Sequence, residues 1–473
     1  MFVGRTYERA WLEEAWPPTE PTLRVIYGHR RLGKSALIDE FVRGKRHIMY
    51  QAVEGSIADQ LRDLSVSMRS NDSREMSEDA PFATWAEVFE QFSFLADQGP
   101  IVIVLDEYQY LAESDPGLTG RIQEWWNNAV GDRPIYLILC GSNVRFFEQN
   151  ALAEPDVAGN AGTLKMLPLS YRDLAGFFPS WGPEELVRTY AMLGGVPYYL
   201  EQLEPTESLV WNIEHRILVR GAVLYREAEI LLREELRELR TYFSIMRSLG
   251  DGCTRTSEIA ERLQPGGSRS DPSPYLHRLR DLGLVDHITP ITGDSRRRGK
   301  WRIVDPYLRF WFRFVVPYQS LIEHRALPEG FFASEIAPQF DHVLSRPAFA
   351  DICMSWLLRQ ISIGGLDVEA DSVGSWWGPI PNSSAESPRG QTEASVDAIA
   401  LADGMVVLAG DATWSSRPVG TPVLQHLQDV VRHIPGADES TQLVLFGRAF
   451  DADLIAAARA AQVRLVSAAQ LFD

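Results

Sequence analysis

The chain has 473 residues, 45% of them apolar and 23% charged, and a formal net charge of −18. The chain is longer than one compact core usually organises, which predicts several domains. The excess of acidic residues opposes non-specific adhesion to nucleic acid. No stretch approaches the roughly eighteen apolar residues that cross a bilayer, and the acidic N-terminus is unlike a signal peptide, so we expect a cytoplasmic protein with no membrane partner. Cys140, Cys253 and Cys353 lie far apart in the sequence and predict core thiols.

The first predicted elements enclose a phosphate-binding loop. LRVIY (23–27) has the character of a buried strand, and SALIDEFV (35–42) repeats apolar residues at helical spacing. Between them lies the complete GxxxxGK[ST] pattern, in which Lys34 would neutralise phosphate charge and Ser35 would offer a hydroxyl to Mg²⁺; the alternative is a glycine-rich turn with a chance lysine. The predicted nucleotide contacts in the loop are Gly28, His29, Arg30, Arg31, Leu32, Gly33, Lys34 and Ser35.

Two further strands are expected to bring polar groups to the same edge of the sheet. PIVIVLDEYQYL reads as a buried strand of Walker B type, in which Asp106 would bind Mg²⁺ and Glu107 would orient or deprotonate the attacking water. PIYLILCGSN is a third apolar strand, and Ser142 and Asn143 at its end are candidates to sense a γ-phosphate. Because polar residues end most strands, a purely structural role for these two residues stays open.

Six stretches together resemble the archaeal-type ATP-binding family, which also occurs in bacteria: FVGRTYE, GHRRLGKS, LDEYQYL, LILCGS, LPLSYRDL and GGVPYYL. The resemblance covers nearly the whole chain and implies an AAA+-related signalling ATPase of the STAND group, with a winged helix and a restriction-endonuclease-like C-terminal domain. It also implies that Gly4 and Arg5 lie near the adenine and that GGVP begins a helical lid. Family members carry an arginine-rich stretch before the segment matching LPLSYRDL. Here no arginine occurs between Arg145 and Arg172, so we expect ATP binding with slow hydrolysis.

Beyond the lid, the pattern predicts a winged helix-turn-helix. REELRELRTYFSIMRSLG (233–250) has helical spacing, and TSEIAERL and SPYLHRLRDLGLV read as two short helices before a β-wing that ends in GKWRIV. Cations on the second helix and the wing are candidates to contact duplex DNA, namely Arg278, Arg280, Arg296, Arg297, Arg298 and Lys300. The alternative is a protein-interaction module with a solvated arginine loop, so a protein partner or self-association stays open.

The last third of the chain predicts a second α/β unit. The aromatic segment DPYLRFWFRFVVPY is expected to dock one domain on another; helices follow over 329–360, then three strands, with 382–393 as a loop. The resemblance implies a nuclease-type site here, and its acids match Asp397 and Asp411, with Asp351 as a candidate helix acid. Thr413 stands where a lysine is expected. Because threonine has no charge to stabilise the reacting phosphate, we predict a degraded site.

The predicted fold class is therefore α/β: an ASCE-type P-loop parallel sheet with a helical lid, a winged helix-turn-helix and a C-terminal nuclease-like domain. The expected boundaries are 1–180 for the ATPase core, 181–232 for the lid, 233–318 for the winged helix and aromatic connector, and 319–473 for the last domain. The predicted function is an ATP- and Mg²⁺-dependent switch that controls the winged-helix module. A DNA-cleaving ATPase and a non-hydrolysing scaffold stabilised by nucleotide are the alternatives.

Overall fold

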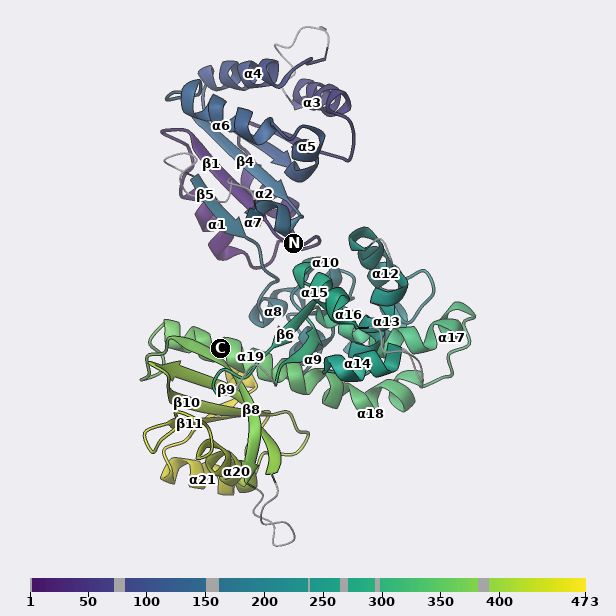
Figure 1. Cartoon of the computed structure of the whole chain (residues 1–473), viewed down its shortest axis with the longest axis vertical. Coiled ribbons are helices and arrows are strands. Elements are labelled where there is room, and N and C mark those ends of the chain that lie inside the picture. The colour runs from purple at the N-terminus through teal and green to yellow at the C-terminus, as the bar shows by residue number, and fades with distance from the viewer. Residues whose placement is uncertain are drawn as a thin grey trace. The chain divides into compact units, whose positions relative to one another are not determined.

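The structure, a computed structural model, describes residues 2–71, 81–149, 161–236, 239–263, 271–293, 298–381 and 391–473. The chain forms two compact units (Figure 1). The first unit comprises Met1–Leu169 and Val196–Tyr198, and the second comprises Ser170–Gly195 and Tyr199–Asp473. Among the described residues, no helix is both long and apolar enough to span a bilayer. Of the three cysteines, all unpaired, Cys140 and Cys353 are core thiols, whereas Cys253 is partly exposed, contrary to expectation.

Five parallel strands form the sheet of the first unit, in the order β2-β3-β4-β1-β5. They are β1 (Thr22–Tyr27), β2 (His47–Gln51), β3 (Ile101–Asp106), β4 (Ile135–Gly141) and β5 (Ala161–Lys165). Every residue of β1, β3 and β4 is buried, as expected for a parallel sheet that helices cover on both faces. Because β4 lies between β1 and β3, the loop after β1 and the acids after β3 face each other across one strand. The predicted ASCE-type P-loop sheet is confirmed.

Helices cover both faces of this sheet (Figure 1). On one face, α1 (Thr6–Glu13) and α2 (Lys34–Val42) pack against Val104 and Ile138 through Leu12 and Phe41. On the other face, the core contains Trp85, Phe92 and Trp125 together with Ile103 and Leu139. The helices on that side are α3 (Ile57–Asn71), α4 (Trp85–Asp97), α5 (Tyr108–Ser114) and α6 (Leu118–Asn128), and the short α7 (Val144–Gln149) follows β4.

The second unit begins with a helical part that surrounds the aromatic segment. Its helices are α8 (Leu174–Phe177), α9 (Pro183–Leu193), α11 (Leu209–Asn212), α12 (Val223–Glu235), α16 (Pro306–Phe310), α17 (Gln319–Glu323) and α18 (Ala337–Phe340). The short α10 (Pro197–Leu200) is divided, because its first two residues belong to the first unit. There are also π-helical turns at Ile213–Ile217, Trp311–Val315, Phe332–Ile336 and Asp341–Ser345 and 3₁₀ turns at Tyr171–Asp173 and Val316–Tyr318. Tyr307 and Trp311 are fully buried, and the Trp311 indole N–H donates to the Tyr225 carbonyl of α12 at 2.8 Å. The aromatic segment is thus the core of the helical part.

Three helices and a two-stranded antiparallel sheet follow in the element order of a winged helix: α13 (Leu239–Gly250), α14 (Thr256–Leu263), α15 (Ser273–Asp281), β6 (Val285–Ile288) and β7 (Lys300–Ile303). Leu276 and Leu279 of α15 are fully buried, and Trp301 of β7 donates its indole N–H to Thr256 at 3.1 Å. The continuous helix expected over 233–250 is wrong: α12 ends at Glu235, and Leu236 has extended backbone with a buried side chain. Apolar spacing at helical period cannot reveal such a break.

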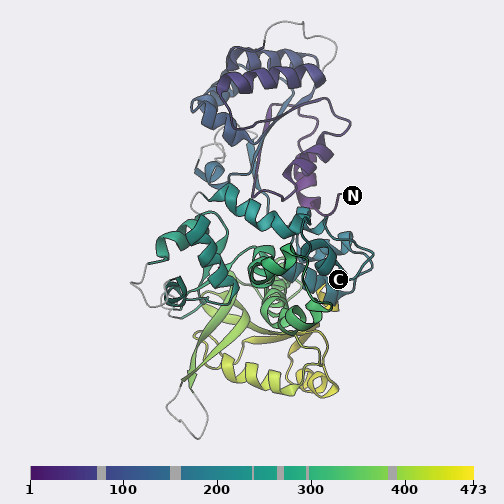
Figure 2. The ribbon, with the colours of Figure 1, turned by 90° about the vertical axis from the view of Figure 1, so that its right-hand side faces the viewer.

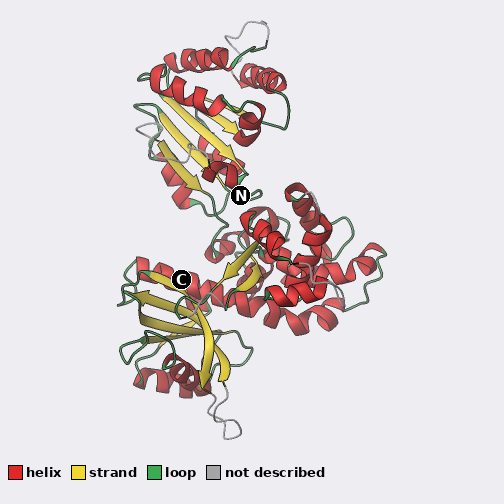
Figure 3. Ribbon diagram, in the orientation of Figure 1, coloured by secondary structure: helices red, strands yellow, loops and turns green. Residues whose placement is uncertain are grey.

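The C-terminal part of the second unit has three layers (Figures 2 and 3). Its sheet has the order β12-β11-β10-β9-β8. The strands are β8 (Ser372–Pro381), β9 (Gln391–Ala402), β10 (Met405–Thr413), β11 (Gln442–Gly447) and β12 (Arg464–Ser467), followed by a 3₁₀ turn at Ala469–Leu471. One face packs on α19 (Arg346–Ser362), and the other on α20 (Thr421–Val431) and α21 (Ala452–Ala460). Of the loop expected over 382–393, residues 382–390 lie outside the described residues, whereas 391–393 belong to β9.

Candidate nucleotide site

The loop between β1 and α2 depends on its two glycines. A Cβ on Gly28 would lie 2.5 Å from the carbonyl oxygen of Met166, so no side chain fits there. Gly33 has φ of 81° and begins α2 from the left-handed region that favours glycine. These constraints turn the loop so that the N-terminus of α2 opens toward the space beside the carboxyl ends of β1, β4 and β3, where a phosphate can be held.

Lys34 and Ser35 occupy the first turn of α2. The buried Lys34 ammonium donates to the carbonyl oxygens of Gly28 and His29 at 2.8 and 3.0 Å. These carbonyls accept the hydrogen bonds that phosphate oxygens could accept instead. Burial lowers the pKa of Lys34. Ser35 donates its hydroxyl to the Asp106 carboxylate at 2.9 Å. A hydroxyl and a carboxylate oxygen are hard ligands of the kind Mg²⁺ prefers, so this pair fits the predicted metal.

Glu107 directly precedes α5 and has φ of 52°, and three donors hold its carboxylate. The Ser142 hydroxyl donates to Glu107 Oε2 at 2.7 Å, and the Ser142 backbone N–H donates to the same oxygen at 3.2 Å. The third donor is the buried side-chain amide of Gln109. The structure thus joins Glu107 and Ser142, as residues of one site should be. Gln109 was not predicted from the sequence, although it lies within the LDEYQYL stretch.

The other predicted contacts brace the loop. Arg5 is buried and donates to the Leu32 carbonyl at 2.9 Å and to Glu8 at 2.8 Å. Arg30 donates to the Tyr110 hydroxyl at 2.9 Å, and the Arg31 guanidinium lies 5.5 Å from the Tyr198 ring centroid. These contacts tie the loop to Arg5, Tyr110 and Tyr198, which lie outside it.

Three remaining predictions around the loop have distinct environments. Burial, reinforced by Lys165 and Lys34, lowers the pKa of His29 and favours a neutral imidazole. Gly4 has φ of 69°, which places it in the left-handed region just before α1. The side-chain amide oxygen Oδ1 of Asn143 accepts from the Phe146 backbone N–H at 3.0 Å, so the Asn143 side chain already caps α7.

Fold and site together define a P-loop ATPase domain. Residues 2–203 match the profile of a family described as an ATPase domain predominantly from Archaea, and residues 311–421 match a family of archaeal and bacterial proteins of unknown function. The uncharacterized protein MJECL04 of Methanocaldococcus jannaschii is 30% identical over 384 residues, which cover 80% of this chain and 82% of that protein. The chain therefore belongs to the archaeal-type ATP-binding family.

Two solved structures resemble the chain at lower identity. The Walker-type ATPase PABY2304 of Pyrococcus abyssi is 20% identical, with a TM-score of 0.48, and the match covers 66% of this chain and 96% of that one. The ORC2 protein of Aeropyrum pernix, solved as ADPNP and ADP complexes, is 16% identical with a TM-score of 0.44, over 68% of this chain and 94% of that one.

The candidate DNA-binding cations have different environments. Arg278 and Arg280 are exposed on α15, whereas Leu276 and Leu279 of the same helix are buried. Arg298 and Lys300 line a pocket against the C-terminal sheet. The other two candidates, Arg296 and Arg297, lie outside the described residues.

The structure brings two of the three candidate nuclease acids together. Asp411 follows Gly410, which pairs with Ala398 on β9, so it lies beside Asp397, whose carboxylate accepts from the Ala412 N–H at 3.0 Å. Asp351 instead forms an ion pair with Arg302 at 3.1 Å. Thr413 ends β10. Within the described ranges, no group of three or more His, Cys, Asp and Glu side chains could hold a metal ion.

Two arginines are candidates to replace the missing lysine: Arg417, the nearest cation in sequence after Thr413, and Arg346, which was not predicted from the sequence. Arg417 is exposed, and its backbone N–H donates to the Ser415 hydroxyl. The charge of Arg346, at the start of α19, opposes the rise in the pKa of both Asp397 and Asp411. Nothing in the spacing of the sequence relates Arg346 to these acids, since more than fifty residues separate it from Asp397.

Proposed function

We propose that the chain is an ATP-dependent switch whose nucleotide state controls the segment formed by α13–α15 and β6–β7. ATP binds at the loop after β1, with Mg²⁺ held by Ser35 and Asp106. The observation that carries this proposal is the pair of contacts at the carboxyl end of β3: Ser35 to Asp106 at 2.9 Å and Ser142 to Glu107 at 2.7 Å. A metal-binding pair and a water-activating pair are what ATP hydrolysis requires of its protein.

Each residue has one task in this mechanism. Lys34 turns from the carbonyl oxygens of Gly28 and His29 to the phosphates, which exchanges neutral acceptors for charged ones. Mg²⁺ bound at this pair would neutralise charge on the phosphates. Glu107 accepts the proton of the attacking water when fewer hydrogen bonds are donated to its carboxylate.

Ser142 links the nucleotide to this release. A serine hydroxyl has one proton to donate, so Ser142 cannot serve the Glu107 carboxylate and a γ-phosphate at once. Binding of ATP turns the Ser142 hydroxyl to the phosphate, which removes the shortest of its contacts with Glu107 and leaves that carboxylate oxygen with fewer donors. Loss of the γ-phosphate restores the contact, which supports a two-state device.

The output of the switch is binding of duplex DNA by the winged-helix segment, and its C-terminal neighbour does not cut DNA. The exposed cations Arg278 and Arg280 on α15 support this output. Recognition of a protein partner by the same surface is the second candidate. Duplex affinity measured with ATP, with ADP and without nucleotide should differ at least severalfold; equal affinities would remove the switch.

Two substitutions separate binding from turnover. Lys34→Ala should lower the affinity for ATP at least about tenfold, because the substitution removes a charge-assisted hydrogen bond to phosphate. Glu107→Gln should keep ATP affinity and lose most hydrolysis, because only the proton acceptor is removed. Affinity is measured by calorimetric titration, and turnover by phosphate release.

Arg43→Ala and Glu113→Gln are the matched controls. Arg43 carries a mostly exposed side chain just after α2, and Glu113 is exposed on α5. Both should behave as wild type. Unchanged ATP affinity in Lys34→Ala would remove the loop from nucleotide binding, and full turnover in Glu107→Gln would remove Glu107 from catalysis.

A further inference from the structure

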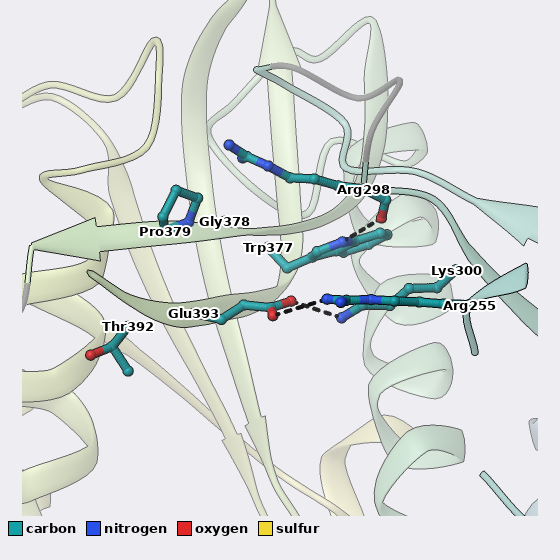
Figure 4. A pocket seen from close by; sticks show the side chains of 8 residues that line it. All are labelled: Arg255, Arg298, Lys300, Trp377, Gly378, Pro379, Thr392 and Glu393. Carbon is teal, nitrogen blue, oxygen red and sulfur yellow. Dashed lines mark hydrogen bonds and ion pairs between the residues drawn. The ribbon is translucent and has the colours of Figure 1, made fainter. Parts of the chain in front are cut away.

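A basic pocket lies where the wing, defined here as residues 285–293 and 298–303 with β6 and β7, meets β8 and β9. The pocket has a volume of about 320 Å³ and is lined by Arg255, Arg298, Lys300, Trp377, Gly378, Pro379, Thr392 and Glu393 (Figure 4). Three cations and one acid give it an excess of two positive charges, in a chain whose formal net charge is −18. Such a local excess attracts an anion that the whole molecule would repel.

One carboxylate bridges two of these cations. Glu393 on β9 lies 3.2 Å from the Lys300 ammonium and 3.7 Å from the Arg255 guanidinium (Figure 4). Arg255 directly precedes α14, and Lys300 begins β7. A phosphate group of a nucleic-acid backbone engages arginine and lysine through paired oxygens in the same way, so the Glu393 carboxylate lies where a phosphate would bind.

The strand β8 is shaped to receive the wing. The Trp377 indole N–H donates to the Arg298 carbonyl at 2.8 Å, and the Ile291 N–H donates to the Ser375 carbonyl at 2.9 Å. A Cβ on Gly378 would lie 2.6 Å from the Arg298 guanidinium, and one on Gly374 would lie 3.1 Å from Ile291. The two hydrogen bonds hold β8 against the wing, and the glycines leave room for the Arg298 and Ile291 side chains beside it.

The ion pairs themselves are weak enough to be displaced. The Lys300, Glu393 and Arg255 side chains are 32%, 52% and 61% exposed, and exposed pairs of this kind contribute less than about 1 kcal/mol. The Lys300 ammonium also lies 4.8 Å from the Trp377 ring centroid, a contact that a phosphate at the pocket would leave in place. A phosphate can thus replace the carboxylate without loss of the wing's position.

We propose that this pocket is a phosphate-binding site for the nucleic-acid backbone, and that Glu393 occupies it in the free chain as an internal competitor. This inference rests on the proposed DNA binding and adds its regulation. Duplex DNA and Glu393 compete for Arg255 and Lys300. The C-terminal sheet therefore lowers the affinity of the winged-helix segment for DNA, and this effect requires no cleavage of DNA.

The test is the salt dependence of duplex binding by the full chain. Binding is measured by the fluorescence anisotropy of a labelled duplex at a series of NaCl concentrations. Glu393→Gln should bind up to about fivefold tighter, because the competing ion pair is worth at most about 1 kcal/mol. Its plot of log affinity against log salt should be steeper by one to two units, because Lys300 and Arg255 then carry salt ions that DNA releases. Lys300→Ala in the Glu393→Gln background should remove about one unit of that slope.

Glu439→Gln is the matched control, because Glu439 is an exposed acid of the same sheet domain and its loss changes net charge equally. Equal affinity and slope for Glu393→Gln and Glu439→Gln, in a chain that binds duplex, would overturn the inference and leave the proposed function standing. No duplex binding by any variant, with ATP binding intact, would overturn both the inference and the DNA output of the switch. Inorganic pyrophosphate at matched ionic strength should compete no better than its charge alone predicts; strong competition would assign the pocket to a small phosphate ligand instead.

Discussion

At the scale of single residues, Asp397 and Asp411 retain one property of an active site. Burial, followed by the neighbouring Asp411 carboxylate, raises the pKa of Asp397 to about 7, and burial also raises the pKa of Asp411. Two carboxylates this close cannot both ionise without a compensating charge, and the pair therefore keeps a proton near neutral pH. Arg346 opposes this effect only in part.

The shared proton predicts a pH dependence of stability. In the unfolded chain Asp397 releases its proton near its ordinary pKa of 3.8, whereas the folded chain keeps it up to about pH 7. Over that window the folded state binds more protons, so its stability falls as the pH rises through it. Thermal unfolding should therefore occur several degrees lower at pH 8 than at pH 5, and Asp397→Asn should reduce this difference.

Asp453→Asn, which replaces an exposed acid of α21, controls for the loss of one negative charge and should keep the wild-type difference. If Asp397→Asn and wild type lose the same number of degrees between the two pH values, the proton does not reside on this pair.

At the scale of elements, α13 touches the aromatic segment through a glycine. A Cβ on Gly250 would lie 2.7 Å from the Phe312 Cβ, and Phe312 is fully buried. Gly250→Ala should therefore destabilise the second unit by about 1 to 3 kcal/mol, because a close contact must be relieved by moving a helix. Calorimetric unfolding measures the loss, and ATP binding by the first unit should not change.

Gly120→Ala provides the opposite expectation with the same chemical change. Gly120 is exposed within α6 and has no atom within 4 Å of an added Cβ, so alanine should stabilise that helix by about 0.5 to 1 kcal/mol. Equal effects of the two substitutions would mean that helix propensity, and not the approach to Phe312, sets the outcome.

The elements also show which features a sequence can predict. Strands β1, β3 and β4 are continuous apolar runs because both faces of the sheet are covered, so their positions could be predicted from composition alone. The break at Leu236 could not be predicted, because its buried side chain continues the apolar spacing of α12 while its backbone leaves the helix. Tertiary packing decides such a position.

The candidate site divides along the same line. The loop, Asp106 and Glu107 follow from a motif in which each position has its own chemistry. Gln109 and Arg346 act through contacts between separate elements, which only the fold creates. The pairing of Glu393 with the wing is of the second kind, since over ninety residues separate it from Lys300.

At the scale of the whole molecule, we predict that the chain does not cleave DNA. Phosphodiester hydrolysis needs both metal-held water and a charge that offsets the one gathering on the phosphate, and Thr413 does not supply that charge. Supercoiled plasmid, linear duplex and single strands incubated with Mg²⁺ or Mn²⁺ and ATP should stay intact. Nicking that disappears in Asp411→Ala would prove the site active.

Thr413→Lys tests whether the rest of the site survives. On a strand, residues 411 and 413 point to the same face, so a lysine at 413 would lie on the Asp411 side of β10. Cleavage gained by this variant, but not by Thr441→Lys, whose residue directly precedes the neighbouring β11, would indicate a recently lost nuclease site.

The return of Val196–Tyr198 to the first unit has a practical consequence for dissecting the protein. A Cβ on Gly33 would lie 3.7 Å from Pro197, and Tyr198 receives the Arg31 guanidinium, so this tripeptide is part of the wall of the nucleotide loop. A fragment that stops at Leu169 would contain the ATPase motifs but would lack the residues that pack against Gly33 and Arg31. A fragment with a complete nucleotide site must therefore extend past Tyr198. It then also contains α9, because α9 lies between Leu169 and Val196 in the sequence.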